Sequence, residues 1–400
     1  MRFAFIIFIT TLLIYPAPAQ VQIDIPQPYG DNFIESELIE KVSILPLKYE
    51  QYGLVRTDME LKVDGEDYFI LDNQNSQCAY HFNSKGELAN TICVPKKQSS
   101  KNLPQLNNPA WFSINPYKKQ IEIYRFENAT VNRFSYSGKY LDKIELDVTP
   151  SDFIRNKDGD YWIYTGWNNS ETPYRLIKTN AQGSVIGREL RLISKCTPTE
   201  GFAFFATPNR ILFWELLNHT VYAIRNNKIS PLYEFNFGAH NLPRDYHMIP
   251  AEESFTNINQ NGYYSIKKVI ENDTFTYFFL NFSNIQQREM FHVLHNKNSD
   301  EVHVYTENSS IGAFDKAQYL TDENELIFLV SPRKLRRLLS SGTAFIPAPF
   351  MELPEEIRKY RNPVLLKVKL QKSSGTDHSS PTEEDYFYDD SSSDSMYFDY

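Results

Sequence analysis

Short apolar runs separated by polar turns recur along the chain. One unit has an apolar run at Tyr68–Leu71, a second at Cys78–Phe82 and a turn at Asn83–Gly86, which predicts two strands and a hairpin. Runs of the same kind start near residues 68, 121, 161, 211, 263 and 326. Units of about fifty residues are typical of propeller blades. The pattern therefore predicts an all-β fold, a six-bladed β-propeller with four-stranded antiparallel blades.

Two kinds of apolar run occur within these units. At Tyr161–Tyr164 large side chains follow one another without a polar break, so that strand must be covered on both faces. At Ile144–Val148 apolar and polar residues alternate, as in a strand with one face in water. Sheets packed around an axis meet both demands. We therefore expect the six continuous runs to be inner strands and the alternating segments to lie at the rim.

Two terminal segments could close the ring of blades. The predicted strand at 42–47 precedes the first unit, and the one at 364–370 follows the last, so either could complete a blade begun at the other end of the chain. Two short helices are predicted within the last unit. One spans Pro332–Leu339, and the other starts near Leu353 and ends before Pro363. The first is basic and could contact a membrane or a partner, but we favour a surface helix packed on the last blade.

The N-terminus has the features of an export signal. The apolar run Phe3–Ile14 is shorter than the roughly 20 residues of a membrane-spanning helix, which argues against the alternative of a membrane anchor. It is followed by Ala17-Pro18-Ala19, so we predict a signal peptide cleaved after Ala19. Gln20 stands where a bacterial lipoprotein would have Cys. The expected location is periplasmic or extracellular, without a lipid anchor.

The chain divides into four parts on this basis: signal peptide 1–19, N-terminal lead-in 20–41, propeller 42–370 and acidic tail 371–400. We expect 21–36 to be poorly packed and the tail to be disordered, because it is rich in Ser and acidic residues. The formal net charge is −9, but residues 373–400 hold eight acidic residues and no Lys or Arg. The body is close to neutral, which gives no reason to expect nucleic acid as a partner.

Three cysteines are too few for a disulfide-rich scaffold and lack the spacing of a zinc site. A two-residue turn at Lys85-Gly86 would place Cys78 directly opposite Cys93, where a disulfide can form. A four-residue turn would instead place them diagonally. Whether the bond forms is left open by the sequence.

The pattern resembles the six-bladed β-propeller proteins that are abundant in Bacteroidetes and distantly similar to NHL-repeat propellers. Asp67–Asp72 followed by His81–Leu88 resembles the first blade of that family, Tyr233–Gly238 resembles a mid-chain connection, and Asn362–Leu365 resembles the start of the closing strand. The resemblance covers roughly residues 40–370. It implies the propeller fold and an exported location, and it supplies no catalytic residues, because most such proteins have no assigned activity.

Candidate chemical groups are scattered. His292, His295 and His303 are the densest histidine group, but a strand places the first two on opposite faces, so we predict no metal site. Asp158 and Asp160 form a carboxylate pair that a hairpin turn explains without catalysis. No nucleophile elbow, phosphate loop or catalytic Cys occurs. The sequence therefore predicts no catalytic residue and no cofactor.

Two functions remain open. The favoured one is a non-catalytic binding or scaffold module, expected to be a monomer, that presents loops holding Trp167, Tyr246 and His247 to a protein or glycan. The alternative is an enzyme acting on a carbohydrate or small substrate at the mouth of the central channel. Carboxylates or His converging at the channel would favour the enzyme, whereas exposed Tyr, Trp and Asn would favour the binder. The identity of the ligand, and the role of the aromatic residues in the tail, cannot be read from the sequence.

Overall fold

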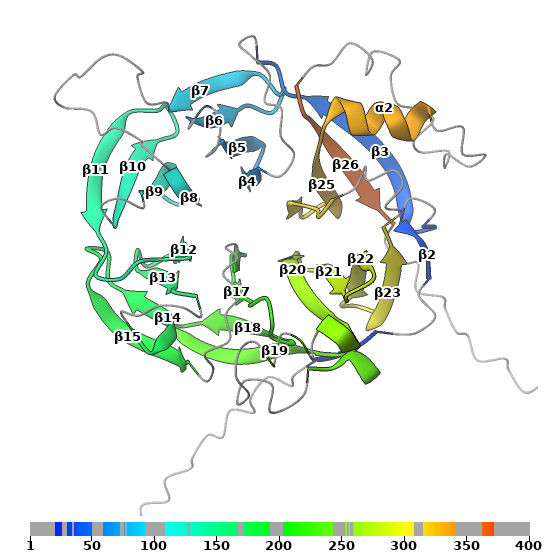
Figure 1. Cartoon of the computed structure of the whole chain (residues 1–400). Coiled ribbons are helices and arrows are strands. Elements are labelled where there is room, and N and C mark those ends of the chain that lie inside the picture. Colours follow the sequence, from blue (N-terminus) through cyan, green and yellow to red (C-terminus); the bar gives the residue numbers. More distant parts are fainter. Residues whose placement is uncertain are drawn as a thin grey trace, which may run out of the picture.

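Six β-sheets, each with a core of four antiparallel strands, stand around a central axis in the computed structural model of the chain (Figure 1). The structure describes residues 21–25, 30–33, 36–49, 59–72, 76, 78–92, 109–125, 129–166, 172–192, 203–242, 253, 256, 259–307, 315–340 and 362–371. Each sheet is one blade of a six-bladed β-propeller. The fold class predicted from the repeat is confirmed.

Blades 1 to 3 are each formed by four strands that are consecutive in the sequence. Blade 1 contains β4 (Glu60–Asp64), β5 (Asp67–Asp72), β6 (Cys78–Phe82) and β7 (Leu88–Ile92). Blade 2 contains β8 (Pro109–Asn115), β9 (Gln120–Arg125), β10 (Thr130–Ser135) and β11 (Tyr140–Glu145). Blade 3 contains β12 (Asp152–Arg155), β13 (Tyr161–Tyr164), β14 (Tyr174–Thr179) and β15 (Val185–Arg191).

Blades 4 to 6 each contain a strand from the N-terminal segment, which is a fifth strand in blades 4 and 5 and the fourth strand in blade 6. Blade 4 contains β16 (Phe204–Ala206), β17 (Ile211–Phe213), β18 (Thr220–Arg225), β19 (Lys228–Asn236) and β1 (Val21–Asp24). Blade 5 contains β20 (Tyr263–Glu271), β21 (Phe275–Ser283), β22 (Arg288–Asn296), β23 (Glu301–Thr306) and β2 (Gly30–Asn32). Blade 6 contains β24 (Tyr319–Leu320), β25 (Glu325–Val330), β26 (Val364–Leu370) and β3 (Ile39–Pro46).

The first strand of every blade lies next to the axis, because β4, β8, β12, β16, β20 and β24 contact one another in a ring. The runs expected to be inner strands are the second strands in five blades, and only the run near residue 263 belongs to an innermost strand. The second strand is covered on both faces and both edges, so it is the most apolar; all four residues of β13 are buried. The innermost strand borders the channel and carries polar side chains. At the rim, the predicted alternation of Ile144–Val148 is confirmed by burial.

The ring closes in blade 6, where both terminal segments predicted as closing strands belong to the same sheet. The outermost strand, β3, pairs antiparallel with β26, and Leu366 faces Ile44 across the ladder. In Figure 1 the blue β3 lies beside the orange β26. The first and last parts of the propeller are thereby held together by backbone hydrogen bonds.

The N-terminal lead-in is not poorly packed where the structure describes it. Strand β1 pairs in parallel with β19, and β2 pairs in parallel with β23, so the segment follows the outer edges of blades 4 and 5 before it enters blade 6. Ile23 and Phe33 are fully buried. The expectation failed because the outer edges of the two blades supply the hydrogen-bond partners, and a parallel pairing between distant segments leaves no local sequence signal.

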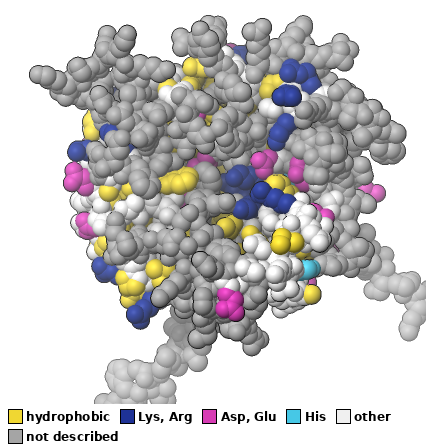
Figure 2. All heavy atoms as spheres, in the orientation of Figure 1, with side chains coloured by type: hydrophobic (Ala, Val, Ile, Leu, Met, Phe, Trp, Pro, Cys, Tyr) yellow, Lys and Arg dark blue, Asp and Glu magenta, His cyan; other side chains and the backbone are white. Residues whose placement is uncertain are grey.

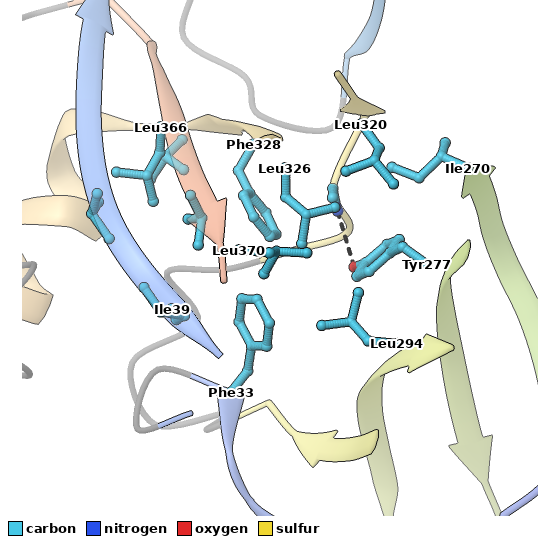
Figure 3. Close-up of a cluster of buried hydrophobic side chains, with 14 of the residues drawn as sticks. Phe33, Ile39, Ile270, Tyr277, Leu294, Leu320, Leu326, Phe328, Leu366 and Leu370 are labelled. Atoms are coloured by element: carbon cyan, nitrogen blue, oxygen red, sulfur yellow. Dashed lines mark hydrogen bonds between the residues drawn. The ribbon is translucent and has the colours of Figure 1, made fainter. Parts of the chain in front are cut away.

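Phe33 enters the apolar cluster between blades 5 and 6 (Figure 3). Its ring stacks on His292 at a centroid distance of 4.5 Å. In the same cluster the Tyr277 hydroxyl accepts a hydrogen bond of 3.1 Å from the Ala317 N–H. Burial of these groups together fastens the N-terminal segment to the last two blades.

Two helical elements have bounds within the described residues. Helix α2 (Pro332–Ser340) confirms the first predicted helix, and its Leu335 is buried in the cluster between blades 5 and 6. A 3-10 turn spans Gly238–His240. The second predicted helix lies outside the described residues.

The hairpin of β6 and β7 has a longer turn than the two-residue turn considered first. The Gly86 N–H donates to the Asn83 carbonyl, and a bulge follows, after which Ala79 pairs with Ile92. Gly86 has φ +69°, and a Cβ there would lie 2.2 Å from the Pro46 carbonyl oxygen, so only Gly fits. Cys78 is disulfide-bonded. Cys93 lies outside the described residues, and its pairing with Cys78 stays a prediction.

Candidate functional site

A cavity of about 400 Å³ lies on the axis of the propeller, and residues from all six blades line it. Its walls are the innermost strands and the turns that follow them, such as the β4–β5 turn at Asp64 and Gly65 and the β12–β13 turn at Asn156–Asp158. Lys268 of β20 and Tyr319 of β24 complete the wall. A cavity of this size matches known sites for small ligands.

The mouth of the cavity carries amide and aromatic side chains. Asn156, Asn209, Asn226 and Asn227 lie in its turns, and Tyr117 is 61% exposed there. Asn226 and Asn227 both have positive φ, as the two central residues of the β18–β19 hairpin require. The Asn156 side-chain amide donates to the Asn227 side-chain oxygen at 3.3 Å, which joins the turns of blades 3 and 4.

Charged side chains line the interior of the channel below these turns. Lys62 forms an ion pair with Glu60 on β4. The buried Asp152 carboxylate accepts hydrogen bonds from the backbone N–H groups of Phe153, at 2.8 Å, and Ala203, at 2.6 Å. Figure 2 shows Lys and Arg side chains together near the centre of the ring, with Asp and Glu side chains beside them. The carboxylates of Glu60 and Asp152 therefore each have a partner, which is the Lys62 ammonium for Glu60 and two backbone N–H groups for Asp152.

Lys268 enters the cavity through an irregularity in β20. Ile266 pairs with Leu280 and Lys268 with Phe279, so Lys267 is the extra residue of a β-bulge. The bulge places Lys268 on the opposite face from Ile266 and so toward the cavity. Lys268 is only 3% exposed. Its ammonium has no hydrogen-bond or ion-pair partner among the described residues.

The pKa values of these groups follow from burial and from their neighbours. Burial lowers the pKa of Lys268 to about 7, and the positive charge of Lys62 acts in the same direction. Burial also raises the pKa of Asp152 to about 6, although Lys62 opposes this shift. For Lys62 burial disfavours the charge, but Glu60 and Asp152 outweigh it and hold the pKa above its ordinary value.

Other buried charges tie neighbouring blades together. Arg155 of blade 3 donates to Glu122 of blade 2 at 2.7 Å, and Arg175 of blade 3 pairs with Glu215 of blade 4. Between blades 4 and 5, Glu271 accepts from Arg210 and Lys297. These ion pairs belong to the packing of the ring and give it polar contacts at three successive interfaces.

The model of one known protein family matches nearly the whole propeller. The family model described as a domain of unknown function, DUF4934, matches residues 20–369. The chain belongs to this family. No curated protein matches it.

Two solved structures are similar to this chain at low sequence identity. The "Putative exported protein (BF0058)" from Bacteroides fragilis NCTC 9343 has a TM-score of 0.67 and 16% identity, over 88% of this chain and 100% of that one. A member of the DUF4221 family from Bacteroides vulgatus ATCC 8482 has a TM-score of 0.49 and 12% identity, over 83% of this chain and 97% of that one. The first supports the propeller fold predicted by resemblance. A relation to NHL-repeat propellers stays a prediction.

The residues predicted to bind a partner, Trp167, Tyr246 and His247, lie outside the described residues. The chain segments that carry them join the end of β13 to β14 and the end of β19 to β20. Both leave the blades on the face opposite the turns that form the mouth of the cavity.

The histidines proposed and rejected as metal ligands do lie on opposite faces of β22. His292 packs on Phe33 between blades 5 and 6, whereas His295 lies near Tyr233 and contacts Asp300 at 2.7 Å. Within the described ranges, no group of three His, Cys, Asp or Glu side chains is arranged to hold a metal ion. In the same part of the chain, no helix has the length and apolar character needed to cross a membrane.

Sequence reasoning missed Lys268 and the cavity around it. The available signal was the pair Lys267-Lys268 inside the otherwise apolar strand from Tyr263 to Ile270. Strict alternation directs one of two adjacent lysines into the packed face of a sheet. Such a pair in a predicted inner strand indicates either a bulge or a polar channel.

Proposed function

We propose that this protein is an exported, non-catalytic binding module that holds a small ligand in the cavity at the channel mouth. The observation that carries the proposal is the composition of the mouth, where Asn side chains and the exposed Tyr117 gather and no His is present among the described lining residues. Amide and aromatic groups recognise polar ring compounds such as sugars through hydrogen bonds and stacking. A glycan unit is therefore the favoured ligand class.

The arrangement inside the channel also supports binding over catalysis. General acid–base chemistry needs a titratable group that is free to exchange a proton with the substrate. Glu60 is paired with Lys62, and Asp152 already accepts two backbone hydrogen bonds. Both carboxylates are engaged in holding the channel together.

An enzyme remains the second candidate because two pKa values are displaced toward neutrality. Asp152 has a pKa of about 6 and Lys268 of about 7, and both shifts arise mainly from burial. Displaced values of this kind are common in active sites. Slow release of product from glycans incubated with the purified protein, abolished by Asp152→Asn, would favour this alternative.

Three observations support export. The sequence of residues 1–19 has the features of a signal peptide, the structural neighbour from Bacteroides fragilis carries "exported" in its name, and Cys78 is disulfide-bonded. Structural disulfides are rare in reducing compartments. N-terminal sequencing of the protein recovered from its cells should begin at Gln20, and retention of Met1 would contradict export by this signal.

The test of the binding proposal is calorimetric titration of the purified protein with mono- and oligosaccharides. Tyr117→Ala should weaken binding about tenfold, as loss of an aromatic contact does. The matched control is Ile285→Ala, because Ile285 is 75% exposed and lies in the β21–β22 turn, on the opposite face. Equal affinity in the wild type and Tyr117→Ala, with any saccharide that binds, would place the ligand elsewhere.

The surface around Trp167, Tyr246 and His247 is proposed as a second contact site, for a protein partner. Trp167→Ala and Tyr246→Ala should reduce capture of a partner from the cell envelope and leave saccharide binding unchanged. If both variants retain the partner at wild-type levels, this surface is not the contact site.

A further inference from the structure

The channel holds a buried lysine, Lys268, that has no hydrogen-bond or ion-pair partner among the described residues. Four charged side chains influence the charge of Lys268. They are Lys62, Lys316, Glu60 and Asp152. Glu60 and Asp152 have donors of their own, as described above. Lys268 is the cation that lacks a partner among the described residues, and it faces the cavity.

Buried ammonium groups are normally paired, because removing an isolated charge from water is costly. A lysine that is 97% buried and unpaired in a cavity therefore indicates a ligand that supplies the counter-charge. Since Lys268 carries a single charge, a singly charged anion fits it better than the double charge of a phosphate, which Glu60 and Asp152 would repel.

The cavity wall offers further groups for the rest of such a ligand. The indole N–H of the buried Trp162 and the side-chain oxygen of the buried Gln318 have no hydrogen-bond partner in the part of the chain that the structure describes, and both residues line the cavity. Buried polar groups without partners are uncommon in native proteins. Phe205 and Tyr319, whose ring centroids are 5.9 Å apart, provide an aromatic wall nearby.

We propose that the cavity binds an acidic sugar, whose single carboxylate pairs with the ammonium of Lys268 while its ring lies between the aromatic wall and the amide-rich mouth. This inference rests on the proposed binding function and specifies the class of ligand. The volume of about 400 Å³ accommodates a ligand of one or two sugar rings. Trp162 and Gln318 supply one donor and one acceptor for its hydroxyl groups.

Binding of this ligand is coupled to proton uptake. The charged groups facing Lys268 are Glu60 and Lys62 from β4, Asp152 from β12 and Lys316 before β24. With a pKa of about 7, Lys268 is partly neutral at physiological pH, and a bound carboxylate raises that pKa by favouring the charged form. The affinity should therefore fall as the pH rises above 7, by up to roughly tenfold per pH unit.

The experiment compares galacturonate with galactose, which differ in one carboxylate, by calorimetric titration of the purified full-length protein at pH 6. Galacturonate should bind at least tenfold more tightly than galactose. Lys268→Met should remove this preference and leave the weaker binding of galactose. Lys157→Met is the matched control, because Lys157 lines the same cavity but is exposed at its mouth, and it should retain most of the preference.

Two further measurements use the wild-type protein and do not depend on the folding of a variant. Titrations at pH 8 in buffers of different ionisation enthalpy should show that a proton is taken up with galacturonate and none with galactose. Acetate and inorganic phosphate, tested at pH 6, should each bind more weakly than galacturonate.

Each contrary result has a defined meaning. Equal affinity for galactose and galacturonate, without proton uptake, overturns the acidic ligand but leaves a neutral-sugar site at the mouth. Absence of galacturonate binding at millimolar concentration overturns the acidic sugar, and the wider saccharide titrations then decide the binding function separately. Tighter binding of phosphate than of galacturonate overturns the choice of a carboxylate.

Discussion

Charged side chains are buried both at the interfaces between blades and in the central channel, but the two regions differ in how these charges are paired. Between blades, Arg155 meets Glu122 and Arg175 meets Glu215, so each guanidinium has a carboxylate partner. In the channel, Lys268 is as deeply buried and has no partner among the described residues. Arg keeps its charge wherever it is placed, whereas Lys can lose its proton when burial is unfavourable.

The paired Arg and Glu side chains stabilise the fold, whereas the proposed role of Lys268 is to bind a ligand. A buried ion pair offsets its own desolvation and holds two blades in register. An unpaired lysine lowers the stability of the empty protein, and this cost is recovered only when an anion occupies the cavity. Removing charge should therefore change stability in opposite directions at the two places.

The largest effect is expected at the interface between blades 3 and 4. Arg175→Met should lower the free energy of unfolding by about 3–5 kcal/mol, because it leaves the buried Glu215 without its main counter-charge. The measurement is chemical denaturation at pH 7. Arg175→Met combined with Glu215→Leu should recover most of the loss, and a single variant of wild-type stability would show that the pair does not hold the blades.

Lys268→Met should have the opposite sign and raise the free energy of unfolding by about 1–4 kcal/mol at pH 6. The folded pKa is about 7 and the unfolded value is near the ordinary 10.5. The unfolded chain therefore binds more protons between these pH values, and wild-type stability rises with pH across that window. The advantage of the variant should fade toward pH 10. Denaturation at pH 6, 8 and 10 checks it, and a variant less stable at pH 6 would contradict the comparison.

His292 provides a third case, a buried group that stays neutral. Burial lowers its pKa to about 3, and one ring nitrogen lies 2.9 Å from the Tyr277 hydroxyl. Because the unfolded pKa is higher, its contribution to stability is lost as the pH falls from about 6.5 toward 3. Between pH 7.5 and pH 5 the wild type should lose about 2 kcal/mol more than His292→Gln. Parallel loss in both proteins would show that His292 titrates normally.

The smallest effect is expected at the surface. On β11 the Lys143 ammonium nitrogen lies 3.4 Å from a Glu145 carboxylate oxygen, and the two side chains are 54% and 75% exposed. Exposed pairs contribute little because water and salt screen them. Lys143→Ala should unfold at the same denaturant concentration as the wild type, and a clear loss would mean that surface pairs also hold the ring.

The repeat of apolar runs was enough to predict the propeller, because each blade repeats the same local pattern. Helix α2 and the closing strand β26 could also be predicted, because each has a local pattern of its own in the sequence. The parallel strands β1 and β2 could not be predicted, since their partners β19 and β23 are more than two hundred residues away in the chain.

The site was harder to predict than the fold for a related reason. Lys268 reaches the cavity only because the bulge at Lys267 reverses the alternation of β20. The cavity itself is built from turns of separate blades that no sequence spacing brings together. Trp167, Tyr246 and His247 were chosen from long loops, which propellers carry on either face, and composition alone does not indicate which face binds.

The pKa of Lys268 tests the comparison most directly. NMR spectroscopy of the protein with isotope-labelled lysine side chains, assigned with Lys268→Met, can follow the titration of this amine with and without galacturonate. We expect a pKa of about 7 in the free protein and a higher value, shifted toward that of an ordinary lysine, once galacturonate is bound. A pKa near 10 in the free protein, unchanged by galacturonate, would contradict an unpaired lysine that awaits an anionic ligand.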